Sequence, residues 1–245
     1  MNEQLLLDNI RGVLVRLEET IIFALIERAQ FLANPIAYEA NRFGQVTAGE
    51  SLAGYLLHET EKIHARIRRY TSPDEHPFFS DLPAPILPPL RYDENPVLPH
   101  RINVNVALRN CYEREIIPFI CRAGDDAQYG STAVCDVACL QALSRRIHYG
   151  MFVAESKFRE APEDFTVPIR KRDEAALLAL ITDAAVEATV LRRVEGKVRT
   201  YCQELTGTVE QSRVDPRRLA EVYRRWIIPM TKAVEVEYLL QHPTA

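Results

Sequence analysis

The stretch ALSRRIHYGMFVAESKF, residues 142–158, has the periodicity of a helix, and it indicates the fold class of the whole chain. Arg146 and Lys157 are eleven residues apart in it, which brings them within about 20° of each other around a helix axis. Gly150 and Val153 lie between them on that face and fill little space. We therefore expect two long cations on one helix face, separated by a gap.

Helical periodicity continues along most of the chain, which has only 9 glycines in 245 residues. No alternating pattern typical of strands persists, so we predict an all-α, multi-helix bundle that forms a single domain over residues 1–245. Pro118 should kink one helix. Ser51 should cap a second helix, and either Ser131 or Thr132 should cap the long central one. The expected helices are 3–32, 51–70, 102–123, 131–160, 162–170, 173–181, 183–206, 215–226 and 228–241.

Residues 73–100 contain more than half of the 15 prolines. Proline lacks a backbone N–H and resists both helix and sheet, so this stretch should run extended over the surface. The helices on both sides have apolar faces that need partners. We therefore expect the segment to belong to the same domain rather than to link two.

Composition excludes several classes of function. The net charge of −4 argues against a general nucleic-acid-binding surface, and no apolar run reaches the length of a membrane span. The five cysteines are odd in number and have no CxxC spacing, which favours a reducing compartment. The first residues lack the pattern of a secretory signal, so we expect a cytoplasmic protein.

Common catalytic motifs are also absent from the sequence. There is no phosphate-binding glycine loop, no GxSxG elbow and no histidine pair at metal-binding spacing. We therefore expect a protein that uses neither a metal nor another cofactor.

Several charged or polar residues do fall on otherwise apolar helix faces. Each could be an ordinary surface residue: a snorkelling cation, an acidic first turn or a solvated helix side. Taken together they could instead line a cavity with three cations, which would suit a small dianionic ligand such as a dicarboxylate. These residues are Arg11, Arg146, Lys157, Asp183, Glu187, Thr231 and Glu235.

Five stretches together resemble the yeast-like, all-helical chorismate mutases, in the same order and at matching separations. They span nearly the whole chain, and the set is far more specific than any one of them. The stretches are NIRGVLVRLEETIIFALIER (9–28), IHARIRRYTSPDEHPFF (63–79), YGSTAVCDVACLQALSRRIHYGMFVAESKF (129–158), AVE (185–187) and IIPMTKAVEVEYLL (227–240).

The resemblance implies a reaction, the rearrangement of chorismate to prephenate in phenylalanine and tyrosine biosynthesis, and a role for each residue. Arg11 and Arg146 would each bind one substrate carboxylate, and Lys157 would bind the ether oxygen. Glu235 would face that oxygen from the other side and would have to be protonated to donate to it. Glu187 would hold the ring hydroxyl, and Thr231 would help to seat the substrate.

Asp183 departs from the family pattern, because fungal relatives have asparagine there. A further carboxylate beside a dianion is unfavourable unless a cation or a proton neutralises it. Asp183 is therefore the weakest member of the expected substrate-binding set.

The resemblance also implies a homodimer with an effector site for tyrosine and tryptophan. Arg68, Arg69, Gly130 and Ser131 match positions of that site. Val134 stands where fungal relatives have threonine, and the loop before Gly130 lacks the paired asparagines of the yeast type. Regulation is therefore expected to be altered or weakened.

Other functions are compatible with an all-helical chain of this composition. One is a non-catalytic interaction protein that kept the fold, and another is an unrelated helical regulator that binds a dicarboxylate. A secreted mutase is a further alternative, against which the missing signal segment counts. Loss of Arg11, Arg146, Lys157 or Glu235 would favour the non-catalytic class, but all four are present.

Overall fold

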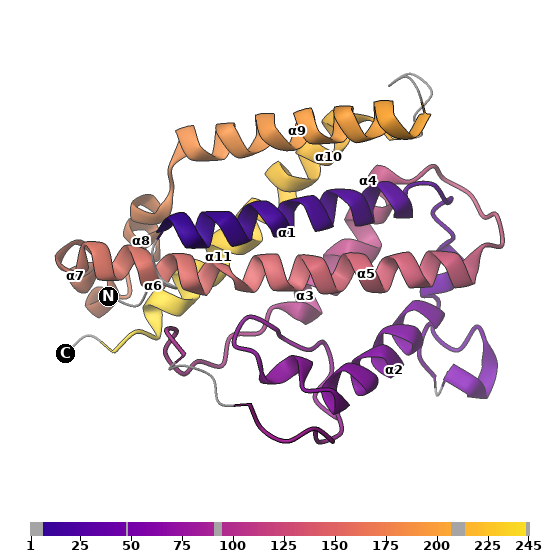
Figure 1. Ribbon diagram of the computed structural model, residues 1–245, viewed down its shortest axis with the longest axis horizontal. Helices are drawn as coiled ribbons and strands as arrows, with labels where there is room; N and C mark the ends of the chain where they lie inside the picture. The colour runs from indigo at the N-terminus through magenta and orange to yellow at the C-terminus, as the bar shows by residue number, and fades with distance from the viewer. Residues whose placement is uncertain (1–6, 48, 91–94, 207–213, 244–245) are drawn as a thin grey trace.

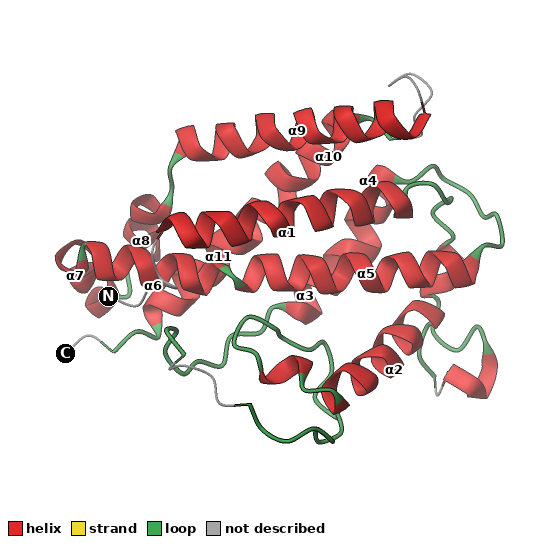
Figure 2. Cartoon of the chain, viewed as in Figure 1, coloured by secondary structure: helices red, strands yellow, loops and turns green. Residues whose placement is uncertain are grey.

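The computed structural model describes residues 7–47, 49–90, 95–206 and 214–243, and these residues form helices and loops without a strand (Figure 2). The all-α prediction is therefore confirmed. The α-helices are α1 (Leu7–Arg28), α2 (Leu52–Arg66), α3 (Asn105–Cys111), α4 (Ile117–Ile120), α5 (Tyr129–His148), α6 (Gly150–Glu160), α7 (Pro162–Lys171), α8 (Glu174–Ile181), α9 (Ala184–Thr206), α10 (Pro216–Val222) and α11 (Ile228–Leu240).

The centre of the fold is the packing of α1 against α5 (Figure 1). α9 lies against the other side of α1, and α2 packs against α5. The apolar repeat of α1 is buried as its spacing predicts: Ile21 and Leu25 have no exposed surface. The first residues of the expected helix, 3–6, lie outside the described residues.

A buried ion pair joins α1 to α5. Arg28 Nε lies 2.7 Å from Asp136 Oδ1, and both side chains are buried. The hydroxyls of Tyr38 and Tyr112 also donate to the Asp136 carboxylate. Every charge in this cluster has a partner, which a buried ion pair needs if it is not to destabilise the fold.

Two prolines each follow a single π-helical turn. The turn at Tyr112–Ile116 connects α3 to α4 before Pro118, and the turn at Tyr223–Ile227 connects α10 to α11 before Pro229. A wider turn accommodates a proline, because its ring clashes with the carbonyl of the preceding turn. The expected separate helices 215–226 and 228–241 are therefore one continuous helical run.

Two expected details of the central helix were wrong. Residues 131–160 do not form one helix, because Tyr149 separates α5 from α6. α5 begins at Tyr129 without a side-chain cap, and Thr132 instead accepts a hydrogen bond from Asn34 Nδ2. Ser51, in contrast, caps α2 as expected by accepting from the backbone N–H of Gly54.

The described part of the proline-rich segment forms irregular loops along one side of the helices (Figure 2). Side chains of the helices hold its backbone and its acidic residues. Glu61 accepts from the backbone N–H groups of Phe78 and Phe79, and Arg145 Nε donates to Asp74 at 2.8 Å.

Candidate active site

Arg146 is the only one of the two adjacent arginines at the end of α5 that turns inward. Arg145 pairs with Asp74 at the surface, whereas Arg146 is only 9% exposed. Its one hydrogen bond within the described residues is a long one, 3.4 Å, from Nη1 to Thr231 Oγ1. No carboxylate of the described residues forms an ion pair with it. A buried guanidinium left in this state costs free energy unless an anionic ligand completes it.

Lys157 and Glu235 form a second part of the same site. Lys157 Nζ, on α6, lies 3.6 Å from Glu235 Oε2, on α11. Lys157 also donates to the backbone carbonyl of Ile181, the last residue of α8. That carbonyl lacks a partner within its helix and lies at the negative end of the helix dipole, so it fixes the ammonium group.

The Glu235 carboxyl is buried, and its Oε2 atom has no hydrogen-bond partner within the described residues. Burial raises the pKa of Glu235 to about 7, although Lys157 and Arg146 oppose this rise. Near neutral pH the carboxyl can therefore exist protonated, as a hydrogen-bond donor. An unpartnered buried oxygen with a pKa in this range is typical of a functional group.

Gly150 has a different role from the one its sequence position suggests. A Cβ atom there would lie 3.0 Å from both Thr231 Cγ2 and the Thr231 carbonyl oxygen, and 3.2 Å from Glu235 Cγ. The space beside Gly150 is thus occupied by α11. The glycine does not leave a gap for a ligand; it lets α11 approach α6 closely enough to bring Thr231 and Glu235 to the site.

Glu187, in the first turn of α9, is held by Lys232 Nζ at 2.9 Å. Lys232 was not among the residues that the sequence predicted for the site. It lies one helical turn before Glu235 and is among the cations that lower the pKa of that carboxyl. Only the contact between the first turn of α9 and α11 reveals it, since its partner Glu187 is 45 residues away.

Asp183 and Arg11 are less closely associated with these residues. Asp183 is exposed and caps α9, since its Oδ1 accepts from the backbone N–H groups of Ala185 and Val186. Its charge is thus stabilised by the helix N-terminus. Arg11 is exposed near the start of α1, so it is not buried together with Arg146, Thr231 and Glu235.

A further polar cluster lies behind Arg146. Glu18 of α1 is buried and accepts two hydrogen bonds from Arg193 of α9, at 2.9 and 2.7 Å. Burial lowers the pKa of Arg146, and the nearby Tyr223, Glu235 and Glu18 oppose this change. Glu18 is already held by Arg193, so it leaves the guanidinium of Arg146 available.

The four residues expected at an effector site occupy two separate places. Arg69 contacts Gln141 of α5 at 2.8 Å and Glu75 at 3.0 Å, and Arg68 donates to the Pro88 carbonyl. Gly130 and Ser131 are exposed in the first turn of α5. Ser131 precedes Gln141 by ten residues, or about 15 Å along a helix. The chain alone therefore does not bring the two arginines to Ser131.

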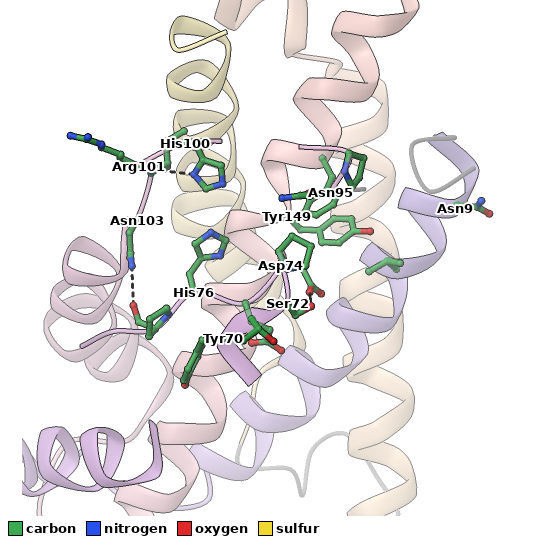
Figure 3. Close-up of a pocket in the computed structure, with 18 residues that line it drawn as sticks. Asn9, Tyr70, Ser72, Asp74, His76, Asn95, His100, Arg101, Asn103 and Tyr149 are labelled. Carbon is green, nitrogen blue, oxygen red and sulfur yellow. Dashed lines mark hydrogen bonds between the residues drawn. The ribbon is translucent and has the colours of Figure 1, made fainter. Parts of the chain in front are cut away.

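The structure also contains a cavity of about 1090 Å³ between the proline-rich segment and the α1 and α6 helices. Figure 3 shows His76 and His100 side by side in its lining, with their ring centroids 5.7 Å apart. Its described lining includes none of the residues expected to bind substrate. Volume alone would thus point away from Arg146 and Glu235, whereas the buried, incompletely partnered charges identify the site. Within the described residues, no three His, Cys, Asp or Glu side chains are arranged to hold a metal ion.

Among the helices described, none combines the length and apolarity that crossing a bilayer requires.

Comparison with known proteins gives consistent results for sequence and structure. Residues 128–236 match the family described as chorismate mutase type II. The chain is 45% identical to chorismate mutase of Schizosaccharomyces pombe over 245 residues, which cover 98% of this chain and 97% of the relative.

Two solved structures superpose closely. AtCM1 with tyrosine bound in its allosteric site gives a TM-score of 0.89 at 45% identity, covering 98% of this chain and 97% of that one. Aro7p chorismate mutase from Candida albicans, in complex with L-Trp, gives 0.90 at 41% identity, covering 97% and 91%. By sequence along nearly its full length and by fold, the chain belongs to the chorismate mutase family of isomerases.

Proposed function

We propose that the cluster around Arg146 is the active site at which chorismate rearranges to prephenate. The observation that supports this most is the buried Arg146 guanidinium, which lacks a carboxylate partner among the described residues. A substrate carboxylate could accept two parallel hydrogen bonds from it, and charge-assisted bonds of this kind are worth roughly 1.5–3 kcal/mol each. Arg11, at the exposed rim, would bind the second carboxylate.

The reaction is intramolecular: a carbon–oxygen bond of the ether breaks while a carbon–carbon bond forms between the side chain and the ring. It requires no nucleophile from the protein. The residues must hold the side chain over the ring and stabilise the negative charge that develops on the ether oxygen. A rate acceleration of ~10⁶ corresponds to ~8 kcal/mol, which a few preorganised contacts and restricted motion can supply.

Lys157 and Glu235 are the proposed donors to the ether oxygen. The ammonium group carries a full positive charge, and the protonated carboxyl offers an O–H from the opposite side. An ionised Glu235 would repel the developing charge instead, so only its protonated form is active. Binding of a dianion next to Glu235 favours this form further, since it disfavours a second nearby negative charge.

Glu187, Thr231 and Asp183 have supporting roles in this proposal. Glu187 would accept from the ring hydroxyl of the substrate, with Lys232 fixing its orientation. Thr231 already contacts Arg146 and would seat the substrate beside it. Asp183 would act mainly through the start of α9, where it caps the turn that carries Glu187.

A spectrophotometric assay of chorismate loss tests the assignment of Arg146. Arg146→Ala should lower kcat/KM by about 10²–10⁴, the loss expected for two charge-assisted bonds. Arg145→Ala is the matched control, because it removes the adjacent arginine, which pairs with Asp74 at the surface. Equal kcat/KM in the two variants would mean that Arg146 does not bind the substrate.

For regulation, we propose a homodimer whose effector site combines Arg68 and Arg69 of one protomer with Gly130 and Ser131 of the other. The separation of these pairs within one chain supports a shared site. The relatives with tyrosine or tryptophan bound support the ligand class. The backbone N–H groups at the start of α5 would bind the amino-acid carboxylate. Val134 is 61% exposed beside them and cannot hydrogen-bond a ligand, which would weaken the response.

Two measurements test this regulatory proposal. Sedimentation should give a mass of two chains, and kcat/KM should change when tyrosine or tryptophan is added. Val134→Thr should enlarge that change without altering kcat/KM in the absence of effector. A monomer whose rate still responds to tyrosine would contradict the shared site.

We also propose that residues 1–245 act as one domain in the cytoplasm. The proline-rich segment supports a single domain because its backbone is bonded to Glu61 of α2 and its Asp74 is paired with Arg145 of α5. All five cysteines are free thiols, which suits a reducing compartment. A single cooperative unfolding transition, and cytosolic fluorescence of a tagged chain, would be the corresponding observations.

A further inference from the structure

A second buried carboxylate, Glu155, lies on α6 close to the proposed catalytic pair. It is 2% exposed and accepts a hydrogen bond of 2.6 Å from the Tyr238 hydroxyl and one of 2.5 Å from Arg159 Nε. His242 Nε2 lies 3.4 Å from the same carboxylate. Glu155 thus joins α6 to α11 and to the residues that follow α11.

The same cluster anchors the end of the proline-rich segment. The Tyr238 hydroxyl donates to Glu155 and accepts from the backbone N–H of Leu98 at 3.1 Å. Arg159 Nη2 donates to the carbonyl of Pro96 at 3.0 Å. The Tyr238 hydroxyl therefore has both a donor and an acceptor partner, which fixes its position more tightly than one bond would.

These contacts lie on the two helices that carry Lys157 and Glu235. Glu155 precedes Lys157 by two residues, and Tyr238 follows Glu235 by three, so each pair is rigidly connected through its helix. At the other end of the interface, Gly150 lets Thr231 approach to the closest packing distance. The α6–α11 interface therefore includes a close approach at Gly150 and a side-chain hydrogen bond between Glu155 and Tyr238.

We propose that Glu155 is a positioning residue, which through Tyr238 sets the separation between Lys157 and Glu235. This inference rests on the proposed role of Glu235 as a protonated donor. Without the Tyr238 hydroxyl, α11 can rotate or shift relative to α6, and the Lys157–Glu235 distance of 3.6 Å is no longer fixed. A displacement of about 1 Å at a reacting group can cost ~10²-fold in rate.

Tyr238→Phe is the direct test, because it removes one hydroxyl and keeps the buried ring. Tyr112→Phe is the matched control: Tyr112 is equally buried and also donates to a buried carboxylate, Asp136, away from α6 and α11. In each variant the carboxylate keeps its arginine partner: Glu155 keeps Arg159, and Asp136 keeps Arg28. Tyr238→Phe should lower kcat by about tenfold, and Tyr112→Phe should leave it near wild type.

The pH profile gives a readout that a purely structural role would not change. Lys157 lowers the pKa of Glu235, so a longer mean distance between them should raise this pKa. The alkaline limb of kcat should therefore move to higher pH by about half a unit in Tyr238→Phe, even though kcat falls. If both tyrosine variants lose activity equally and keep the wild-type limb, Glu155 is only structural.

Substitutions of Glu155 provide a second test. Glu155→Gln keeps an oxygen that can accept from Tyr238 and should retain more of kcat than Glu155→Leu, which keeps none. Circular dichroism shows whether Glu155→Leu folds, and if it does not, the Tyr238→Phe profile decides. A folded Glu155→Leu with wild-type kcat and limb would overturn the inference.

Glu235→Gln separates failure of this inference from failure of the proposed function. If Glu235→Gln keeps the alkaline limb, Glu235 is not the titrating donor, and the proposed role of that residue is wrong. If the limb disappears in Glu235→Gln but stays at its wild-type pH in Tyr238→Phe, only the positioning role of Glu155 is wrong.

Discussion

Lys157 Nζ lies 3.6 Å from Glu235 Oε2, so the buried carboxyl of the candidate active site has a fixed cation beside it. The two effects on Glu235 act in opposite directions. Burial favours the neutral acid, whereas the ammonium favours the carboxylate, and burial prevails, leaving the pKa at about 7. The protonation state of Glu235 is thus poised within the physiological range.

The rate should depend on pH through this group. Because only the protonated carboxyl can donate to the ether oxygen, kcat/KM should fall as the pH rises through about 7. Glu235→Gln carries a neutral donor at every pH and should flatten this limb. Chorismate loss measured from pH 5 to pH 9 checks it, and identical profiles for the two proteins would exclude this role of Glu235.

The same group predicts a pH dependence of stability. The pKa of Glu235 is raised on folding from 4.5 to about 7, so the folded state binds the proton more tightly than the unfolded state does. This contribution is fully present below pH 4.5 and is lost as the pH rises through 7. It amounts to roughly 3 kcal/mol, since one pKa unit corresponds to 1.36 kcal/mol.

Glu235→Gln removes that contribution, so the variant should gain stability relative to the wild type as the pH rises from 5 to 8. Denaturant unfolding at the two pH values measures the difference. Glu61→Gln provides the comparison. Burial also raises the pKa of Glu61, but the hydrogen bonds that its carboxylate accepts from the backbone N–H groups of Phe78 and Phe79 oppose this rise. A constant stability difference between Glu235→Gln and wild type would contradict the raised pKa of Glu235.

Replacing Arg146 or Arg28 by methionine should change the free energy of unfolding in opposite directions. Arg146→Met removes a buried charge without a carboxylate partner among the described residues and should raise the free energy of unfolding by about 1–3 kcal/mol while abolishing most activity. Arg28→Met instead strands the buried Asp136 and should destabilise by about 3–5 kcal/mol. Thermal unfolding distinguishes them. Destabilisation by Arg146→Met would show that its charge is satisfied in the free protein.

Replacing Gly150 or Gly196 by alanine should also have opposite effects on stability, because only Gly150 is closely packed. Gly150→Ala places a methyl group 3.0 Å from the Thr231 carbonyl, which must move α11 away from α6 and should lower both Tm and kcat. At Gly196, within α9, a methyl group would meet no neighbour within 4 Å, so Gly196→Ala should stabilise by about 1 kcal/mol. Unchanged kcat in Gly150→Ala would show that this close approach does not position Thr231 or Glu235.

Most of the helices could be predicted from the sequence, because the spacing of apolar residues along a helix shows which face is buried. The spacing of Leu7, Ile10, Leu14, Leu17, Ile21 and Leu25 predicted the inner face of α1. Ile10, Leu17, Ile21 and Leu25 are buried and Leu14 is half-buried, whereas the side chain of Leu7 lies outside the described part. The resemblance to chorismate mutases identified the family, which the comparisons confirmed. The assignment of individual catalytic residues stays a prediction, although four of them form two contacting pairs: Arg146 with Thr231, and Lys157 with Glu235.

Other features depend on how the helices pack. Helix periodicity gives the direction of a side chain but not the distance to another helix, so it could not reveal that Lys232 meets Glu187 or that the space beside Gly150 is filled by Thr231. It also could not predict that Tyr149 interrupts the helix carrying Arg146 and Lys157. Local sequence specified most of the helices and identified three side chains that are buried at the site, Arg146, Thr231 and Glu235, although Arg11 and Asp183 proved to be exposed. The packing of α6 against α11 determined whether those charges are paired, because burial and a neighbouring cation together set the pKa of Glu235.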